Sequence, residues 1–368
     1  MVTERSDGLT VVIATRNRAA FLIPLLEYYA GSGLQAQVVI GDSSEEDQIK
    51  SIQAALGRVE DRLHIRYHRY PTYADRAPGM GFIHCVSDLI QHHVTTTYVV
   101  VAADDDFLIP AALAQAVDFM EDHPDYSAVH GKTLLGILAD GAEVELVGTE
   151  FHLQRSITDS LATERLRNHL TCGAATEYSV KRTVQTVAHW EASLAVVEEQ
   201  FLGELLRSCL SVIDGKVHQL DRLYMVRRGH RRMTSRRSDD CFDQLVHPVW
   251  PRQYARFRDS LAEALCLKDE VTLAEAREII KETFWAYLAK QIVRQWQVRY
   301  ARRNGQVAWR ARLREIPWLR QMYREVFSRL PGEAHAMSLS ALLRRSSPYH
   351  RDFLPIYQTI TKPHASIN

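Results

Sequence analysis

Short runs of apolar, largely β-branched residues that end in polar residues constrain the fold of this chain most strongly. They are TVVIA (10–14), QVVIGDSS (37–44) and TTTYVVVA (95–102), and LHIRYH (63–68) alternates as a further strand. Apolar strands of this kind are typical of a parallel sheet that is covered on both faces. Helical segments separate them, so the pattern predicts right-handed βαβ units in an α/β fold.

Polar residues follow these predicted strands. Thr15 and Asn17 follow the first strand, Asp42 ends the second, and an aspartate triplet at 104–106 follows the last. We expect Thr15 or Asn17 to cap the helix predicted for residues 19–30. In parallel sheets ligands bind beyond the carboxyl ends of the strands. The sequence therefore predicts a ligand site at this edge of the sheet.

The triplet Asp104, Asp105 and Asp106 suggests a cation. Neighbouring carboxylates repel one another unless a cation or a set of donors offsets the repulsion. Mg²⁺ and Mn²⁺ prefer oxygen ligands and commonly bind phosphates as well. The alternative is a solvated acidic turn before the helix that Pro110 is predicted to begin, where acids are favourable on their own.

Charge and cysteine usage restrict the class of protein. Lys+Arg and Asp+Glu both number 45, so no global charge attracts the chain to nucleic acid. The five cysteines are widely spaced and form no CxxC, which indicates reduced thiols. The polar start MVTERSDGLT predicts no signal peptide, and no run of about 18 apolar residues predicts a membrane span. We expect a cytoplasmic protein.

The rest of the chain alternates less regularly. A hairpin is predicted to turn at Asp140-Gly141, and residues 198–210 predict an amphipathic helix with two glutamates at its start. Thr272 and Glu275 predict a capping box before a long helix. The predicted organisation is a nucleotide-sugar-binding half at 1–110, an acceptor-binding and catalytic half at 111–235, and a helical region at 236–368.

Four motifs together carry a family resemblance. VVIATRNR, VVIGDSS and VVVAADDDF, in this order, resemble the nucleotide-sugar-binding half of GT-A-fold glycosyltransferases, and inverting family 2 above all. The segment EEQFLGELLRSCLSVIDGKVHQLDRLYMVRRGHRRMTS resembles the acidic-pair helix and closing segment of that family. The resemblance covers residues 9–235. It implies a Rossmann-like, mostly parallel sheet flanked by helices, here with an α-helical C-terminal extension.

The resemblance implies roles at the strand ends. Thr15 and Asn17 would lie near the nucleotide, and Asp42 would accept a hydrogen bond from the base. The alternative for Asp42, which Ser43 and Ser44 follow, is a helix cap. Asp104 would face the ribose or the water shell of a divalent metal, Mn²⁺ or Mg²⁺, and would count among its ligands. The nucleotide-sugar-binding residues so implied are Thr15, Asn17, Asp42, Arg76, Asp104 and Asp105, and the metal ligands are Asp104, Asp106 and His230.

The resemblance also implies a catalytic base. Glu199 matches the acid that takes the acceptor proton, with Glu198 as its neighbour. The alternative is that both only form the acidic first turn of a helix. His230 lies in RRGHRR, which could instead be a solvated, phosphate-attracting loop in which Arg227, Arg228 or Arg231 contacts the diphosphate. Arg76 is the nearest match to the family's arginine or asparagine that approaches the nucleotide, and it is offset from the usual family spacing.

The implied function is transfer of a sugar from a nucleotide-diphospho-sugar, with UDP as the favoured nucleotide, to a hydroxyl acceptor with inversion. The acceptor is a glycan, a lipid-linked sugar or a small molecule. Two alternatives stay open. A nucleotidyltransferase should carry an N-terminal Gly-rich loop, which ATRNRAAF lacks, and a non-catalytic glycan- or protein-binding relative should lose the acids, which are present.

The C-terminal region is rich in arginine and tryptophan. Residues 291–330 contain ten arginines and two glutamates. One interpretation is a helical subdomain that packs on the rest of the chain or forms a homodimer. The other is a peripheral contact of 236–368 with an anionic membrane at its inner face. Nucleic-acid binding is not expected, because the chain is neutral overall.

Overall fold

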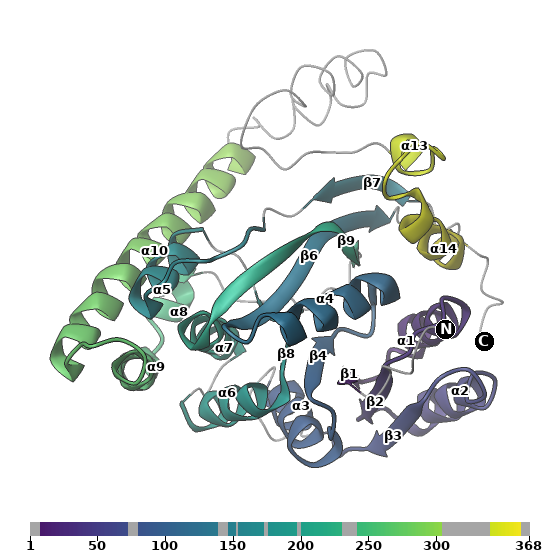
Figure 1. Ribbon diagram of the computed structural model, residues 1–368, viewed down its shortest axis with the longest axis horizontal. Helices are drawn as coiled ribbons and strands as arrows, with labels where there is room; N and C mark the ends of the chain where they lie inside the picture. Colours follow the sequence, from purple (N-terminus) through teal and green to yellow (C-terminus); the bar gives the residue numbers. More distant parts are fainter. Residues whose placement is uncertain are drawn as a thin grey trace.

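The first four predicted strands form the parallel part of a sheet. The computed structural model describes residues 8–72, 80–138, 146–151, 154–172, 176–196, 200–229, 241–303 and 339–361. Within them these strands pair in parallel in the order β3-β2-β1-β4 (Figure 1). Their bounds are Leu9–Thr15 for β1, Gln37–Asp42 for β2, Ile65–Arg69 for β3 and Tyr98–Ala102 for β4.

Alternate residues of β1 enter two different cores, as the pleat of a strand requires. Val11 and Ile13 belong to a cluster that includes residues of the helices α1 (Ala19–Gly31), α2 (Glu46–Leu56) and α4 (Pro110–Asp122). Val12 belongs to a second cluster, with residues of α3 (Met80–His93) and Trp190 of α6 (Thr183–Val196). All three side chains are fully buried. The sheet is therefore covered on both faces, which explains why these strands are apolar at every position.

The second half of the sheet is mixed. The full order in the described residues is β3-β2-β1-β4-β8-β6-β9-β5, with β7 paired to β6. β9 runs parallel to β6, whereas β5, β7 and β8 pair antiparallel with their neighbours. The remaining strands are β5 (Asp106–Leu108), β6 (Tyr126–Leu138), β7 (Leu146–Phe151), β8 (Val180–Arg182) and β9 (Lys216–Gly229).

The α/β class with C-terminal helices is confirmed. β6 and β7 form the predicted hairpin, although its turn at Asp140-Gly141 lies outside the described residues. The bounds of the helices are α1 Ala19–Gly31, α2 Glu46–Leu56, α3 Met80–His93, α4 Pro110–Asp122, α5 Ala162–Cys172, α6 Thr183–Val196, α7 Gln200–Asp214, α8 Cys241–Leu245, α9 Trp250–Cys266, α10 Leu273–Arg303, α13 Leu339–Leu342 and α14 His350–Thr361.

The C-terminal helices pack in two places. α9 and α10 join α5 and α7 in a separate apolar cluster, and the predicted capping box starts α10, with the Thr272 N–H donating to Glu275 Oε2 at 2.8 Å. In contrast α14 returns to α1 and β9, where Phe353 and Ile356 complete the first cluster. None of the helices in the described part of the chain has the length and apolarity needed to cross a membrane.

The predicted cap of α1 is wrong. Arg18 is the N-cap residue and makes no side-chain cap hydrogen bond. Asn17 adopts φ 53°, a left-handed conformation that asparagine tolerates. Its side chain accepts from the Glu45 N–H at 2.8 Å instead, and its own N–H donates to Ser44 Oγ at 2.7 Å. Asn17 therefore joins the ends of β1 and β2, and the side chain of the N-cap residue Arg18 bonds Asp104 and Asp105.

Candidate functional site

The three aspartates lie buried at the carboxyl end of β4. Asp104 and Asp105 form the turn after this strand, and Asp106 begins the short strand β5. Their exposed fractions are 4%, 9% and 2%. β5 pairs antiparallel with β9, so that Asp106 lies opposite Arg227. The pairing brings the triplet next to the Arg-rich end of β9, which is distant in the sequence.

Asp104 is held from the end of β1. Thr15 Oγ1 donates to Asp104 Oδ2 at 2.7 Å, and Arg18 Nε donates to Asp104 Oδ1 at 2.7 Å. Arg18 Nη2 also bonds Asp105. Thr15, Asp104 and Asp105 were all predicted site residues, and the structure brings them together. Arg18 was not predicted, although its place just after the first strand end was a signal for it.

Asp106 is held from the end of β9. Arg227 Nε donates to Asp106 Oδ2 at 3.1 Å, and the Arg228 backbone N–H donates to Asp106 Oδ1 at 3.3 Å. The Arg227 guanidinium also lies 5.1 Å from the centre of the Tyr178 ring. Each aspartate of the triplet is thus bonded to an arginine, as buried charges must be paired to be tolerated.

Burial changes the acidity of two aspartates of the triplet, Asp104 and Asp106. Desolvation raises the pKa of Asp104 to about 6, although the positive charge of Arg18 acts in the opposite direction. Desolvation likewise raises the pKa of Asp106 to about 7, against the effect of Arg227. Ionised carboxylates in this site are therefore unfavourable for folding, which is common where charged groups serve a function.

Arg228 has two hydrogen-bond donors without a partner among the described residues. The residue is 8% exposed, and its Nε and Nη1 atoms are buried without a hydrogen-bond partner. Its guanidinium lies 5.0 Å from the centre of the Phe21 ring, and that of Arg18 lies 4.4 Å from the same centre. Desolvation lowers the pKa of Arg228, whereas Asp105 raises it. Unused guanidinium N–H groups beside a strand-end site are suited to bind an anion such as phosphate.

Asp42 lies at the end of β2 with no exposed surface. Its Oδ1 accepts from the Ser44 N–H at 2.7 Å, and its Oδ2 accepts from the Tyr67 hydroxyl. This turn precedes α2, whose N-cap residue is Glu45, so Asp42 does not cap that helix. A base N–H would have to share the oxygens of Asp42 with these two donors.

Four predicted site residues lie outside the described part of the chain. They are Arg76, Glu198, Glu199 and His230. Among the described residues no three His, Cys, Asp or Glu side chains are arranged to hold a metal ion. The oxygens of Asp104 and Asp106 instead accept hydrogen bonds from arginine and threonine. In this arrangement the described acids do not fit a metal ion unless Arg18 and Arg227 move away from them.

Glu204 on α7 is a further acid at the site. Its side chain is exposed, yet desolvation by the surrounding protein raises its pKa, and the charge of Glu177 raises it further. Arg207 and Arg227 lower it. Arg227 interacts with both Glu204 and Asp106, so it connects these two acids. Glu204 was not among the predicted site residues. Its charge, at a position between the apolar residues Leu202 and Leu206, was the signal that the sequence offered for it.

Arg207 supports Glu204 from one turn further along α7. Arg207 is 2% exposed, and its Nη2 donates to Glu177 Oε2 at 3.1 Å. Its Nη1 donates to Ser193 Oγ at 3.0 Å, and its guanidinium lies 3.9 Å from the centre of the Trp190 ring. These contacts fix α7 against α6 and hold positive charge beneath Glu204.

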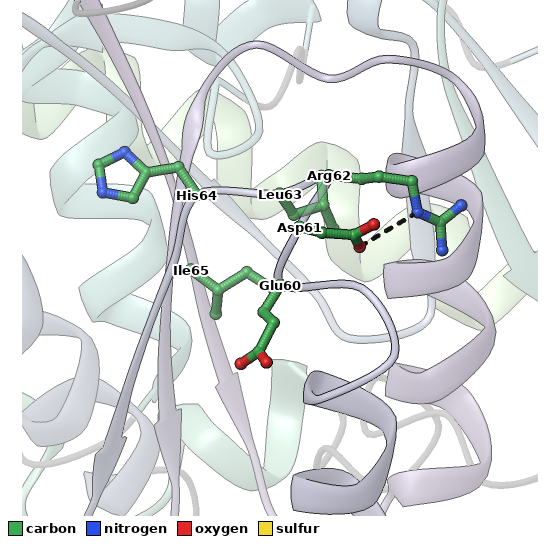
Figure 2. Close-up of a pocket in the computed structure, with 6 residues that line it drawn as sticks. All are labelled: Glu60, Asp61, Arg62, Leu63, His64 and Ile65. Atoms are coloured by element: carbon green, nitrogen blue, oxygen red, sulfur yellow. Dashed lines mark ion pairs between the residues drawn. The ribbon is translucent and has the colours of Figure 1, made fainter.

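A depression elsewhere on the surface is not part of this site. Figure 2 shows it, with a volume of about 390 Å³ and lined by residues 60–65. These residues lead into β3, so they lie at the opposite end of that strand from the site. The only ion pair drawn there joins Arg62 and Asp61 at 3.6 Å. Nothing in its lining matches the predicted site residues.

No protein-family model and no curated protein matches the chain. Among solved structures it is similar to S. aureus TarS, with 14% sequence identity and a TM-score of 0.44 over 75% of this chain, and it spans 43% of that chain. It is also similar to S. aureus TarS 1-349, with 14% identity, a TM-score of 0.48, and coverage of 96% of this chain and 90% of that one.

The mannosyltransferase PcManGT from Pyrobaculum calidifontis, solved in complex with GDP-Man and Mn²⁺, is similar with 13% identity and a TM-score of 0.43. The similarity covers 85% of this chain and 82% of that one. At these values the likenesses assign neither an activity nor a ligand to this chain.

Proposed function

We propose that this chain is a glycosyltransferase that moves a sugar from a nucleotide-diphospho-sugar to a hydroxyl acceptor with inversion. The observation that carries the proposal is the site at the carboxyl ends of β1, β2 and β4. There three buried aspartates are bonded to arginines, and Arg228 keeps two N–H donors without a partner. A diphosphate is the anion that such a site suits, at the sheet edge where nucleotides bind.

The donor contacts follow from the positions of these groups. Thr15, Asn17 and Asp42 are assigned to the nucleoside, with a uracil base favoured for Asp42. Asp104 and Asp105 are assigned to the ribose, and Arg76 to the donor by the family resemblance alone. Arg228 binds the diphosphate and stabilises the charge that develops on it as the glycosidic bond breaks.

A divalent cation, Mn²⁺ or Mg²⁺, is expected as the cofactor. Asp104, Asp106 and His230 are the residues proposed to hold it, and it would supply charge neutralisation of the leaving diphosphate. Because Arg18 and Arg227 bond these carboxylates, the described geometry does not fit the ion. The roles assigned here to the residues of the chain do not depend on it.

Inversion requires a base on the face of the sugar opposite the leaving group. Glu199, with Glu198 beside it, is the base that the sequence predicts. Glu204 competes for the role, because it is exposed, has a raised pKa and interacts with Arg227. A raised pKa suits a carboxylate that must take a proton near neutral pH.

The partners proposed beyond the donor are a glycan, a lipid-linked sugar or a small molecule as acceptor, with no nucleic acid. A cytoplasmic location is proposed as well, because the widely spaced cysteines without a CxxC indicate reduced thiols. Residues 236–368 are proposed to form either a homodimer interface or a peripheral contact with a membrane.

Release of nucleoside diphosphate from UDP-, dTDP- and GDP-sugars tests the proposal. We expect the wild-type protein to release nucleoside diphosphate from one donor. The variant that lacks the base should lose at least 100-fold in turnover, whereas its affinity for the donor should not change. Glu199→Gln, Glu204→Gln and Glu198→Gln, compared side by side, identify that base. Release from none of the donors by the wild-type protein, with or without Mn²⁺, would favour the non-catalytic alternative.

A further inference from the structure

Two arginines lie against one aromatic ring beside the aspartate triplet. The guanidinium of Arg18 lies 4.4 Å from the centre of the Phe21 ring, and that of Arg228 lies 5.0 Å from the same centre. Arg18 comes from the start of α1, whereas Arg228 comes from the end of β9. Desolvation lowers the pKa of Arg228, and the charge of Arg18 lowers it further. We call Arg18 and Arg228 the guanidinium pair.

The guanidinium pair has N–H donors that the protein does not use. Arg228 is 8% exposed, and its Nε and Nη1 atoms are buried without a hydrogen-bond partner. Arg18 donates from Nε and Nη2 to Asp104 and Asp105, and its side chain is 22% exposed. Burial removes water from a guanidinium, so an unused donor costs free energy unless a ligand accepts from it. These donors indicate an anion as the missing partner.

The carboxylates that a divalent cation would need are already bonded. Both oxygens of Asp104 accept hydrogen bonds, from Thr15 and from Arg18, at 2.7 Å each. Both oxygens of Asp106 accept as well, one from the Arg227 side chain at 3.1 Å and one from a backbone N–H at 3.3 Å. A cation placed here would lie beside two positively charged arginines, which repel it.

Aromatic rings and strand pairing keep these arginines on the aspartates. Arg18 lies against the Phe21 ring, and the Arg227 guanidinium lies 5.1 Å from the centre of the Tyr178 ring. The antiparallel pairing of β5 with β9 also places Arg227 opposite Asp106. A divalent cation would therefore have to break an ion pair and a ring contact at each arginine before it reached the carboxylates.

The sequence at the end of β9 supplies further positive charge. Residues 227–237 contain six arginines and no aspartate or glutamate, whereas the chain as a whole has no net charge. A diphosphate is a multiply charged anion, and the planar fork of a guanidinium binds phosphate oxygens with two parallel hydrogen bonds. Arginines can thus supply the positive charge that a metal ion would otherwise bring to a diphosphate.

We infer that the guanidinium pair binds the diphosphate of the donor without a divalent cation, and that the aspartate triplet holds the arginines in place for it. The inference rests on the proposed function in taking a nucleotide sugar as the source of the diphosphate. It departs from the ion that the family resemblance implies, because the carboxylates assigned to that ion are bonded to Arg18 and Arg227.

Calorimetric titration of the full chain with inorganic pyrophosphate, in EDTA and in Mn²⁺, tests the inference without the choice of a nucleotide. We expect the wild-type protein to bind pyrophosphate in EDTA, and Mn²⁺ should not strengthen this binding. Arg228→Gln should bind about tenfold more weakly in EDTA. The matched control is Arg222→Gln, which lies on the same strand but pairs with Asp352 and should bind as the wild type does.

Electron paramagnetic resonance of Mn²⁺ added alone shows whether the carboxylates accept the ion. We expect Arg18→Gln to bind Mn²⁺ at least tenfold more tightly than the wild type, because Asp104 and Asp105 then lose the arginine that they share. Urea unfolding checks that this variant is folded. The pyrophosphate titrations of the wild-type protein do not depend on it.

Pyrophosphate binding that requires Mn²⁺, or equal binding by Arg228→Gln and the wild type, would overturn the inference and leave the proposed function standing. Mn²⁺ binding by the wild type as tight as that of Arg18→Gln would overturn it too. Pyrophosphate binding in EDTA without binding of any nucleoside diphosphate would support the anion site and count against the proposed function.

Discussion

Asp106 and Arg227 face each other across the pairing of β5 with β9, and Arg227 Nε donates to Asp106 Oδ2 at 3.1 Å. The Asp106 side chain is 3% exposed and that of Arg227 is 27% exposed. A single ion pair thus joins two motifs that are more than a hundred residues apart. The same pair closes one side of the candidate site, so it serves both the fold and the site.

Arg227→Gln should lower the free energy of unfolding by about 2 kcal/mol at pH 8, because it leaves a buried carboxylate with one backbone donor. Urea unfolding of Arg227→Gln, Asp106→Asn and the double variant measures the coupling, which we expect at about 1–2 kcal/mol. Additive effects of the two single variants would show that the pair contributes nothing. Arg222→Gln, which breaks the Arg222–Asp352 pair on the same strand, is the control.

Arg228→Gln should weaken the binding of a nucleoside diphosphate about tenfold, the equivalent of about 1.4 kcal/mol. The reason is that the unpartnered Nε and Nη1 donors are lost, whereas the shorter Gln side chain keeps a polar amide group. The affinity for the nucleoside alone should not change. Isothermal titration calorimetry checks both values, and equal diphosphate affinity in Arg228→Gln and wild type would contradict the assignment.

The raised pKa of Asp104 predicts a specific pH dependence. Its folded pKa of about 6 exceeds its ordinary value of 3.8, so between these values the folded state binds more protons than the unfolded state. Ionisation of Asp104 therefore lowers the free energy of unfolding as the pH rises through this window, by up to about 1.4 kcal/mol per pH unit. Asp104→Asn should gain stability relative to wild type from pH 4.5 to pH 6.5.

The difference between variant and wild type is the quantity to measure. Burial lowers the pKa of His130 and His169 to about 4, and these groups give the opposite slope between pH 4 and 6.5. Subtracting the two urea-unfolding curves cancels their contribution. A difference that does not depend on pH would contradict the raised pKa of Asp104.

Gly41→Ala should destabilise the protein by about 1–3 kcal/mol through overpacking. A Cβ atom at Gly41 would lie 2.5 Å from Cys85 Sγ and 2.8 Å from Leu89 Cδ1, both on α3. Gly31→Ala is the matched control, since nothing lies within 4 Å of the added atom. Denaturant midpoints of the two variants decide the question, and equal midpoints would mean that α3 moves aside without cost.

The sequence predicts the parallel strands well because a strand that is buried on both faces of the sheet is apolar at successive positions. Val11, Val12 and Ile13 are apolar in succession since each enters one of two cores. β5 and β8 have three residues each and were not predicted, because so short a segment shows no period. Their pairings depend on residues far along the chain.

The site was predicted in part for the same reason. Thr15, Asn17 and Asp42 could be placed together because parallel strand ends share an edge. The partners of the triplet were not predicted. The place of Arg18 just after the first strand end was a signal for it, whereas the contact of Arg227 with Asp106 depends on the pairing of β5 with β9, which are distant in the sequence. The helix cap expected of Asn17 failed because its side chain bonds the neighbouring strand's turn instead.

The central claim is that a nucleoside diphosphate binds at the strand ends beside the aspartate triplet. Calorimetric titration of UDP, dTDP, GDP and CMP, each with Mn²⁺ and with EDTA, tests it most directly when repeated on Arg228→Gln, because Arg228 keeps two N–H donors without a partner. We predict that one nucleoside diphosphate binds the wild-type protein and that Arg228→Gln loses about tenfold in affinity. Failure of all four to bind in either condition, or equal binding by Arg228→Gln, would contradict it.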